Sequence, residues 1–164
     1  MGSPDGKNMV KRWKIKVADK EDVEKFVEGY VCAYKDLEDY KYRTRREVKN
    51  YFKWLFKRDP EGIFIMEEDG KLVGIVACDS NWVTEKGRVL EIHELFVLPE
   101  YRGTGAGEKL LDIALGYAKK KGLKKVMLWV GKGNERAIRF YKKEGFKIVG
   151  EQGKWLRMEK SLDY

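Results

Sequence analysis

The sequence predicts one α/β (α+β) domain built around a single mixed sheet. The chain has 164 residues, which is enough to bury one hydrophobic core. Its periodic segments follow the order β-α-α-β-β-β-α-β-α-β-β, with no internal repeat and no interdomain linker. Residues 90–111 add a third observation, because an apolar strand, a glycine-rich turn and a helix follow one another there directly.

The N-terminal part predicts a strand followed by a helix. The first nine residues are polar and contain Gly and Pro, so we expect residues 1–10 to be disordered or of cloning origin, and residues 11–164 to form the domain. Apolar residues alternate with lysines over Arg12–Ala18, which predicts a half-buried strand. Asp19 is placed to cap a helix, and an apolar stripe runs along Val23–Tyr34 at helical spacing.

A second helix and a hairpin follow. Thr44 and Glu47 have the spacing of a capping box, and the helix that they open ends at Asp59-Pro60-Glu61-Gly62. Strands are predicted over Ile63–Met66 and Leu72–Asp79, on either side of an Asp-Gly turn. Gly74 lies inside the second of these strands, where we expect another group to approach closely.

The central strand leads into the glycine-rich turn. The strand begins near Arg88 and is stopped by Pro99, and Arg102–Gly107 then places three glycines in six positions before a helix that runs to about Lys121. Free backbone N–H groups and the positive end of the helix dipole meet at such a turn, which predicts an anion site, most often for phosphate. The spacing matches neither the Walker pattern nor the dinucleotide fingerprint.

The C-terminal part completes the sheet. Val126–Val130 is a buried strand, and Asn134 is placed to cap a helix that ends at Gly145. Phe146–Val149 and Trp155–Met158 form a final strand pair. Both α/β crossovers predict a parallel pairing next to the central strand.

Composition limits the classes of function. Charged residues make up 38% of the chain and the net charge is +8, which fits either a nucleic-acid surface or a solvated, lysine-rich face, and we favour the second because the lysines are spread out. There is no apolar run of membrane-spanning length and no secretory segment, so a cytoplasmic protein is expected, with no membrane partner. Cys32 and Cys78 are expected to be buried thiols, although a thermophile source, which the charge content suggests, would permit a disulfide.

The glycine-rich turn also resembles a known motif. Arg102-x-x-Gly105-x-Gly107, after a strand that ends in Pro-Glu-Tyr, resembles the pyrophosphate loop of the GNAT superfamily of N-acetyltransferases, which bind acetyl-coenzyme A. Asn134–Phe146 is similar to the family segment N-x-x-A-x-x-F-Y-x-x-x-G-F. The resemblance extends from about Arg12 to Lys160. It implies the GNAT fold, with a mixed, mostly antiparallel sheet of six to seven strands, four helices and a splayed strand pair at the cofactor site.

The resemblance also implies an activity and a set of roles. Family members transfer an acetyl group directly from acetyl-CoA, their co-substrate, to an amine, and no metal is expected. Tyr141 would protonate the leaving sulfur, and Asn134 would contact the pantetheine arm. Backbone groups of the central strand would bind the acetyl carbonyl and pantetheine, and those of the turn would hold the pyrophosphate; the residues concerned are Leu95, Phe96, Val97, Arg102, Gly103, Thr104, Gly105, Ala106 and Gly107. Tyr141 could instead simply pack, and the Arg102 side chain could only pair with Glu100.

The general base has three candidates, Glu91, His93 and Glu94. Strand alternation puts Glu91 and His93 on one face and Glu94 on the other, unless a bulge reverses the facing. His93 is the only histidine, and histidine titrates in the range that base catalysis needs, yet a lone histidine on a strand is more often structural. Water could also serve in place of all three.

The acceptor is expected to be a small amine or polyamine, or a protein N-terminus or lysine. The acidic, tyrosine-rich segment 35–42 suits a cationic amine, and a solvated helix connection is the alternative interpretation; its relevant side chains are Asp36, Glu38, Asp39, Tyr40 and Tyr42. A coenzyme A-binding module without turnover is the second hypothesis for the function, and a basic nucleic-acid-binding domain is the third. A homodimer is a candidate assembly.

Overall fold

The computed structural model describes residues 13–163 of the chain. Its elements are β1 (Trp13–Val17), α1 (Val23–Ala33), α2 (Arg45–Arg58), β2 (Ile63–Glu68), β3 (Lys71–Thr84), β4 (Gly87–Val97), α3 (Ala106–Lys120), β5 (Lys125–Gly131), α4 (Glu135–Lys143), β6 (Lys147–Gln152) and β7 (Trp155–Ser161). Short 3-10 turns precede α1, α2 and α3. The N-terminal segment 1–10, predicted to be disordered, lies outside the described residues.

The strands form one seven-stranded sheet in the order β1-β2-β3-β4-β5-β7-β6. β4 and β5 are parallel and every other neighbouring pair is antiparallel, as expected for a mixed, mostly antiparallel sheet. The α3 crossover gives the predicted parallel pair. The same prediction for the α4 crossover is wrong, because β7 returns between β5 and β6 and pairs antiparallel with both.

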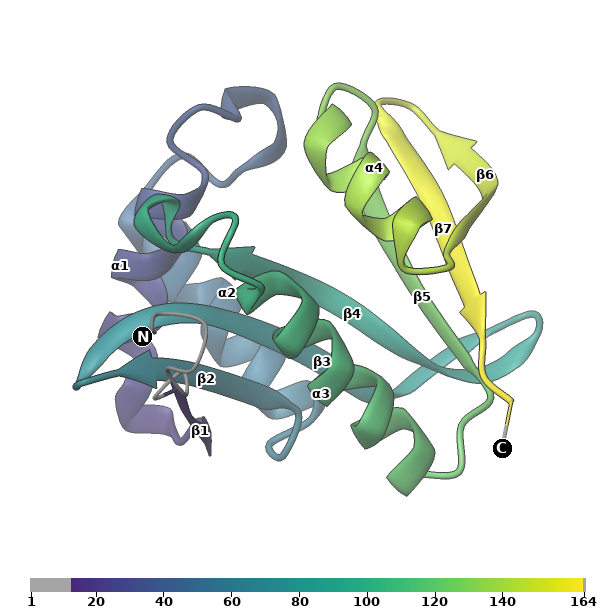
Figure 1. The fold of residues 1–164 in the computed structure, drawn as a ribbon, viewed down its shortest axis with the longest axis horizontal. Coiled ribbons are helices and arrows are strands. Elements are labelled where there is room, and N and C mark those ends of the chain that lie inside the picture. The colour runs from purple at the N-terminus through teal and green to yellow at the C-terminus, as the bar shows by residue number, and fades with distance from the viewer. Residues whose placement is uncertain (1–12, 164) are drawn as a thin grey trace, which may run out of the picture.

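Helices cover both faces of the sheet (Figure 1). In the view of Figure 1, α3 lies in front of the central strands, while α1 and α2 lie behind them. Each face has its own apolar core, one with Leu110, Leu111 and Ala114 from α3, and the other with Phe26 from α1 and Phe52 from α2. The sheet is therefore the shared middle layer that positions groups from both sides.

Local sequence signals account for most element boundaries. Thr44 and Glu47 form the predicted capping box of α2, and the Asn134 carboxamide accepts a hydrogen bond from the Ala137 amide at the start of α4. Asp69 and Gly70 both have positive φ, as the two-residue hairpin between β2 and β3 requires. Gly74 confirms the expected close approach, because a Cβ there would lie 2.5 Å from the carbonyl oxygen of Phe96.

The edge strand β1 is more exposed than its alternating pattern predicts. Ile15 and Val17 are 37% and 49% exposed within the described residues. The reason is that β1 pairs with β2 at the outer edge of the sheet, where its apolar side chains extend beyond the helices that cover the central strands. The amphipathic pattern therefore predicted the strand correctly but not its burial.

Two irregularities of β4 shape the middle of the molecule. β4 pairs with β5 only over Leu90–Ile92, and beyond this point the two strands diverge, as Figure 1 shows. On the other side, Ile92 pairs with Cys78 and Glu94 with Ala77, so His93 is an extra residue in β4. This β-bulge changes the facing of the residues that follow it.

Candidate active site

A cleft of about 840 Å³ opens where β4 and β5 separate. One wall is formed by the second half of β4 and the α1–α2 connection, and the other by β5, the start of α4 and the β6–β7 turn. The glycine-rich turn lines one end of the cleft, and His93 and Glu94 line another part of it. The predicted splayed strand pair therefore produces an open space between buried elements, and most of the predicted site residues lie around it.

The glycine-rich turn has a row of free amides, and its residues Gly103, Gly105, Gly107 and Glu108 line this cleft, whereas Thr104 and Ala106 do not. None of the backbone N–H groups of residues 103–108 donates a hydrogen bond within residues 13–163. Gly103 and Gly105 have φ of +76° and +92°, a conformation that L side chains rarely adopt, and their positions are open rather than crowded by protein. Consecutive N–H groups at a helix N-terminus form an anion site. Thr104 supports the turn by donating its hydroxyl hydrogen bond to the Tyr101 carbonyl.

Two guanidinium groups accompany these amides. Arg102 and Arg136 both line the cleft, and burial together with the neighbouring positive charge of Arg136 lowers the pKa of Arg102. The predicted alternative, in which Arg102 pairs with Glu100, is wrong, because the Arg102 guanidinium donates to the carbonyl of Ala33 at 3.0 Å. Two like charges held near one another beside free amides are suited to a polyanion such as a pyrophosphate.

The divergence of β4 from β5 leaves backbone groups of β4 unpaired on the cleft side. Leu98 donates to the Val73 carbonyl, so the alternation of an antiparallel ladder turns the N–H and C=O groups of Phe96 toward β3 and those of Leu95 and Val97 toward the cleft. A ligand that carries amides could pair with Leu95 and Val97 as an added strand does. Phe96, whose backbone was also predicted to bind ligand, lines the cleft, but the same alternation points its N–H and C=O groups toward β3.

Tyr141 lies in the wall formed by α4. Its ring packs edge-on against Phe140 and Phe146, while its side chain also lines the cleft. Its hydroxyl makes no hydrogen bond within the described residues. Burial, with a smaller contribution from the negative charge of Glu94, raises the pKa of Tyr141 above its ordinary value. The hydroxyl therefore stays protonated at neutral pH and can donate a proton or a hydrogen bond to a group in the cleft.

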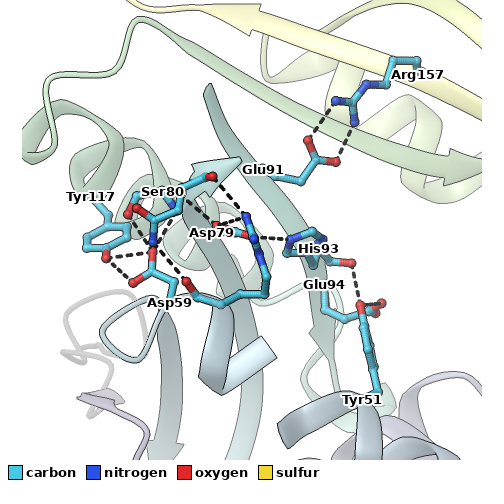
Figure 2. A network of polar contacts seen from close by, with 11 residues as sticks. Tyr51, Asp59, Asp79, Ser80, Glu91, His93, Glu94, Tyr117 and Arg157 are labelled. Carbon is cyan, nitrogen blue, oxygen red and sulfur yellow. Dashed lines mark hydrogen bonds and ion pairs between the residues drawn. The ribbon is translucent and has the colours of Figure 1, made fainter. Parts of the chain in front are cut away.

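Glu94 lies on the opposite wall and is held by two tyrosines. The Tyr34 hydroxyl of the α1 C-cap donates to Oε1 at 2.5 Å. The Tyr51 hydroxyl of α2 donates to Oε2 at 2.9 Å, and Figure 2 shows Tyr51 next to Glu94. Desolvation raises the pKa of Glu94, and the two hydrogen bonds oppose this effect. The carboxylate is thus fixed in orientation between aromatic rings, in a position to meet a cation in the cleft.

The side chains of His93 and Glu94 lie on the same side of the sheet. Simple alternation puts the two on opposite faces, but the bulge allows both to contact α2: Glu94 accepts from Tyr51, and the His93 ring lies 4.9 Å from that of Trp54. His93 Nε2 is 2.9 Å from Oδ2 of Asp79 on β3. The side chain of His93 is 11% exposed and lines the cleft.

Glu91, the third candidate base, lies outside the cleft. Both of its carboxylate oxygens bind the guanidinium of Arg157 on β7, at 2.6 and 2.8 Å, and its side chain is buried (Figure 2). Arg157 in turn lies over the Trp129 ring. A carboxylate held in such a bidentate pair joins β4 to β7 and has no access to a substrate.

The α1–α2 strap (residues 34–44) reaches across the cleft. The Tyr40 hydroxyl accepts a hydrogen bond from the Gly133 amide at 2.7 Å, and the Tyr40 ring lies 5.3 Å from that of Trp155. A Cβ at Gly131 would lie 2.5 Å from the Tyr40 ring, so a glycine there permits the contact. Lys154 donates to the Asp39 carbonyl from the same side. The strap therefore narrows the mouth of the cleft.

The acidic residues of the strap divide between the cleft and the surface. Asp39, Tyr40 and Tyr42 line the cleft, whereas Asp36 and Glu38 do not, and Glu38 pairs with Lys41 at 2.8 Å. The expectation of a wholly acidic acceptor loop therefore holds only in part. The Glu94 carboxylate and the aromatic rings around it form a more compact site for binding a cation than the strap does.

Several residues of the site were not predicted from the sequence. The sequence pattern puts Tyr34 in the apolar stripe of the first helix, Asp79 at the end of a strand and Arg136 at an unassigned position of the second motif, and it gives Tyr51 no role in the site. A tyrosine at a mostly apolar helix position is a weak signal for a buried acceptor, because its hydroxyl needs a partner.

Other features of the described residues bear on the remaining expectations. Both cysteines are free thiols, but Cys32 is exposed, contrary to the prediction that both are buried. No helix within residues 13–163 has the length and apolarity needed to cross a membrane. The same residues contain no group of three or more His, Cys, Asp or Glu side chains placed to hold a metal ion.

Comparison with known proteins identifies relatives over most of the chain. Residues 24–146 match the model of the Acetyltransferase (GNAT) family. An N-acetyltransferase of Archaeoglobus fulgidus is 55% identical over 130 residues, which are 78% of this chain and 88% of that protein. An N-acetyltransferase of Methanocaldococcus jannaschii is 46% identical over 157 residues, covering 94% of this chain and 70% of the relative.

Solved structures share the fold. A Pyrococcus horikoshii protein superposes with a TM-score of 0.82 at 34% identity, covering 93% of this chain and 99% of that one. The PaiA N-acetyltransferase of Thermoplasma acidophilum, crystallised in complex with coenzyme A, has a TM-score of 0.77 at 25% identity, covering 92% and 99% of the two chains.

Proposed function

The chain belongs to the GNAT family of acetyltransferases and is an N-acetyltransferase with acetyl-CoA as co-substrate, and on this premise we propose that it acetylates a primary amine held beside Glu94. One observation supports the proposal above all others. A single cleft has at one end the turn of residues 103–108, whose backbone amides are free and of which Gly103, Gly105, Gly107 and Glu108 line the cleft. Elsewhere in its wall it has an oriented carboxylate among aromatic rings. These are complementary to a pyrophosphate and to an ammonium group.

The residues of the cleft fit the co-substrate. The amides of residues 103–108 and the guanidinium groups of Arg102 and Arg136 would hold the pyrophosphate. The unpaired backbone N–H and C=O groups of Leu95 and Val97 would pair with the pantetheine amides. Asn134, which caps α4 and lines the cleft, would also contact the pantetheine arm. When bound, acetyl-CoA supplies an activated acetyl group as a thioester.

The acceptor end suits a slim, cationic amine. The rings of Tyr30, Tyr34, Tyr42 and Tyr51 lie around Glu94, and aromatic faces together with one carboxylate favour an ammonium ion over a neutral or anionic group. The strap restricts access, so an unbranched alkylamine, a polyamine, a lysine side chain or an extended protein N-terminus would fit better than a bulky amine.

Side chains of the cleft would transfer the protons, and its backbone would stabilise the oxyanion. An alkylamine is mostly protonated at neutral pH and must lose a proton before it can attack, which His93 or Glu94 can accept from the cleft wall. Tyr141, kept protonated by its burial, would donate to the departing sulfur. The N–H of Leu95 or Val97 would stabilise the negative charge that develops on the acetyl oxygen.

An amine-library screen tests the proposal. Purified protein is incubated with acetyl-CoA and with pools of alkylamines, polyamines and peptides with free N-termini or lysines, and free thiol is measured. Thiol release that depends on an amine supports the proposal. Binding of coenzyme A without thiol release for any pool would favour a binding module instead, and salt-dependent nucleic-acid binding without coenzyme A binding would favour the third hypothesis.

A further inference from the structure

We propose that Asp79 is a positioning residue of this active site, and that it sets His93 as the group that takes the proton from the acceptor amine. The proposal rests on the proposed acetylation of an amine and goes beyond it, because it assigns separate roles to His93 and Glu94. It starts from a chain of polar contacts that runs from α2 through β3 to the cleft (Figure 2).

Within this series of polar contacts, hydrogen bonds hold the Asp79 carboxylate in place. It is completely buried, and its oxygens accept hydrogen bonds from Arg58 Nε at 2.7 Å, from Arg58 Nη2 at 3.3 Å and from the Asn81 amide at 2.9 Å. Burial alone would raise the pKa of Asp79, but the hydrogen bonds from His93 and Arg58 outweigh burial and lower it to about 2. The carboxylate is therefore ionised at neutral pH.

An ionised carboxylate determines the tautomer of its partner. Asp79 can only accept a hydrogen bond, and its Oδ2 is 2.9 Å from His93 Nε2, so Nε2 must carry a proton. In the neutral imidazole the lone pair then resides on Nδ1, the nitrogen that can accept another proton. Asp79 also stabilises the imidazolium that forms once Nδ1 has been protonated.

The orientation of the ring is fixed by packing as well. The rings of Trp54 and Trp82 lie 4.9 and 5.0 Å from the His93 ring, both edge-on, and the bulge in β4 places His93 in the cleft wall directly before Glu94. A histidine with only a structural role needs the hydrogen bond to Asp79 but not a position in the cleft wall. Here both features occur together.

Glu94 is suited to a different role. Its two oxygens are each held by a tyrosine hydroxyl, from α1 and from α2, which fixes a negative charge for an ammonium ion to bind. The charged and titratable groups that surround His93 are Asp79 on β3, Glu91 and Glu94 on β4, Arg58 and Tyr51 on α2, and, through Glu91, Arg157 on β7. With Glu91 paired to Arg157, the carboxylates of Asp79 and Glu94 are the anions left near the imidazole, and they favour transfer of a proton from a bound ammonium to Nδ1.

The proton balance is complete with these groups. The ammonium gives one proton to Nδ1 of His93, and the freed nitrogen lone pair forms the new C–N bond while the C–S bond breaks. The sulfur receives a proton from the Tyr141 hydroxyl. The second N–H proton lost by the nitrogen returns through solvent to Tyr141, and His93 releases its proton to solvent.

The test compares Asp79→Asn with the wild type on two amines, ethylamine and 2,2,2-trifluoroethylamine, by thiol release from acetyl-CoA. The asparagine keeps the shape but can donate to Nε2, which puts the His93 proton on Nδ1. With ethylamine we expect kcat to fall about 100-fold. With trifluoroethylamine, whose amine is neutral at pH 7 and has no ammonium proton to lose before it attacks, we expect a loss of no more than about 3-fold. The Kd for coenzyme A should not change.

Two further readouts separate positioning from structural damage. The acidic limb of the pH profile of kcat/KM should move to lower pH in Asp79→Asn, because the imidazolium loses its neighbouring anion. The double variant Asp79→Asn/His93→Gln should lose no more activity than His93→Gln alone. Asp59→Asn is the matched control, since Asp59 is another buried carboxylate, held by Ser80 and Tyr117 away from the cleft, and it should lower Tm without changing the ratio between the two amines.

Several results would overturn the proposal. These are equal losses on the two amines, additive losses in the double variant, or a wild-type pH profile in Asp79→Asn. If Asp79→Asn does not fold, His93→Gln carries the same two-amine comparison, and an equal loss on both amines would again refute it. If the wild type acetylates no amine at all, the proposed function itself has failed, which is distinguishable from a failure of the Asp79 assignment.

Discussion

Replacing Gly105 by glutamate should abolish coenzyme A binding and leave the fold nearly intact. Gly105 has a φ of +92°, and no atom lies within 4 Å of the Cβ that a side chain would add, so the new side chain meets no protein. The left-handed backbone costs a residue with a side chain about 1–2 kcal/mol of folding free energy. The new carboxylate would stand among the free amides of residues 103–108 and take the place of the pyrophosphate.

The expected loss of affinity follows from the number of amides involved. A hydrogen bond to a charged group contributes about 1.5–3 kcal/mol, so losing two of them weakens binding by about 3–6 kcal/mol, or about 10²- to 10⁴-fold in Kd. Repulsion between the carboxylate and the pyrophosphate adds to this. Calorimetric titration with coenzyme A measures the change, and thermal unfolding reports the cost to the fold.

Gly87→Glu is the matched control. Gly87 has a φ of +97° with no atom within 4 Å of its added Cβ, and it is the first residue of β4, directly after the β3–β4 turn and not among the residues that line the cleft. It therefore carries the same backbone strain and the same new charge without touching the proposed anion site. If the two variants bind coenzyme A with equal affinity, the assignment of the glycine-rich turn is wrong.

Three other changes test the remaining parts of the cleft. Tyr141→Phe should lower kcat about 10- to 100-fold with an unchanged Kd for coenzyme A, and full activity in steady-state thiol release would remove its role as an acid. Glu94→Gln should raise the KM for the amine. The pKa of Glu94 is raised in the folded protein. The stability that this group gives the wild type is therefore fully present below the ordinary carboxyl pKa and is lost as the pH rises through the raised value. Glu94→Gln should accordingly have a higher Tm than the wild type at pH 8 and no such advantage at pH 4. Tyr40→Phe removes the hydrogen bond from the Gly133 amide, and Tyr40→Ala also removes the ring. The rate on bulky amines relative to slim amines should therefore rise from wild type to Tyr40→Phe to Tyr40→Ala. An unchanged preference would show that the strap does not select the acceptor.

Features that depend on a few neighbouring residues were predictable from the sequence. The capping box of Thr44 and Glu47, the Asp69-Gly70 turn and the Asn134 cap all form as their residue types indicate. The glycine-rich turn belongs to the same class, because its free amides result from the backbone conformation of six consecutive residues. The order of elements then restricted the topology far enough to expect the parallel β4–β5 pair, and the resemblance to the family implied its separation.

Features that depend on strand register were not predictable. A single extra residue, His93, moves the side chains after it to a different face, and nothing in the local pattern shows that β4 contains a bulge. The same limitation applies to β7, which lies between β5 and β6 because of pairings that form only when the sheet assembles. The α4 crossover therefore did not produce the neighbour that was expected.

The sequence by itself determined the elements, the glycine-rich turn and the family, since each is encoded over a short span of chain or by a motif. Only the tertiary structure decided which acidic residue faces the cleft and what supports it. Glu91 forms a buried ion pair with Arg157, which is 66 residues away in the sequence. Glu94 accepts a hydrogen bond from Tyr34, 60 residues away, and His93 contacts Asp79, 14 residues away. The chemistry of each carboxylate depends on its burial and its partners, and these are set by packing between elements rather than by the residue's neighbours in the chain.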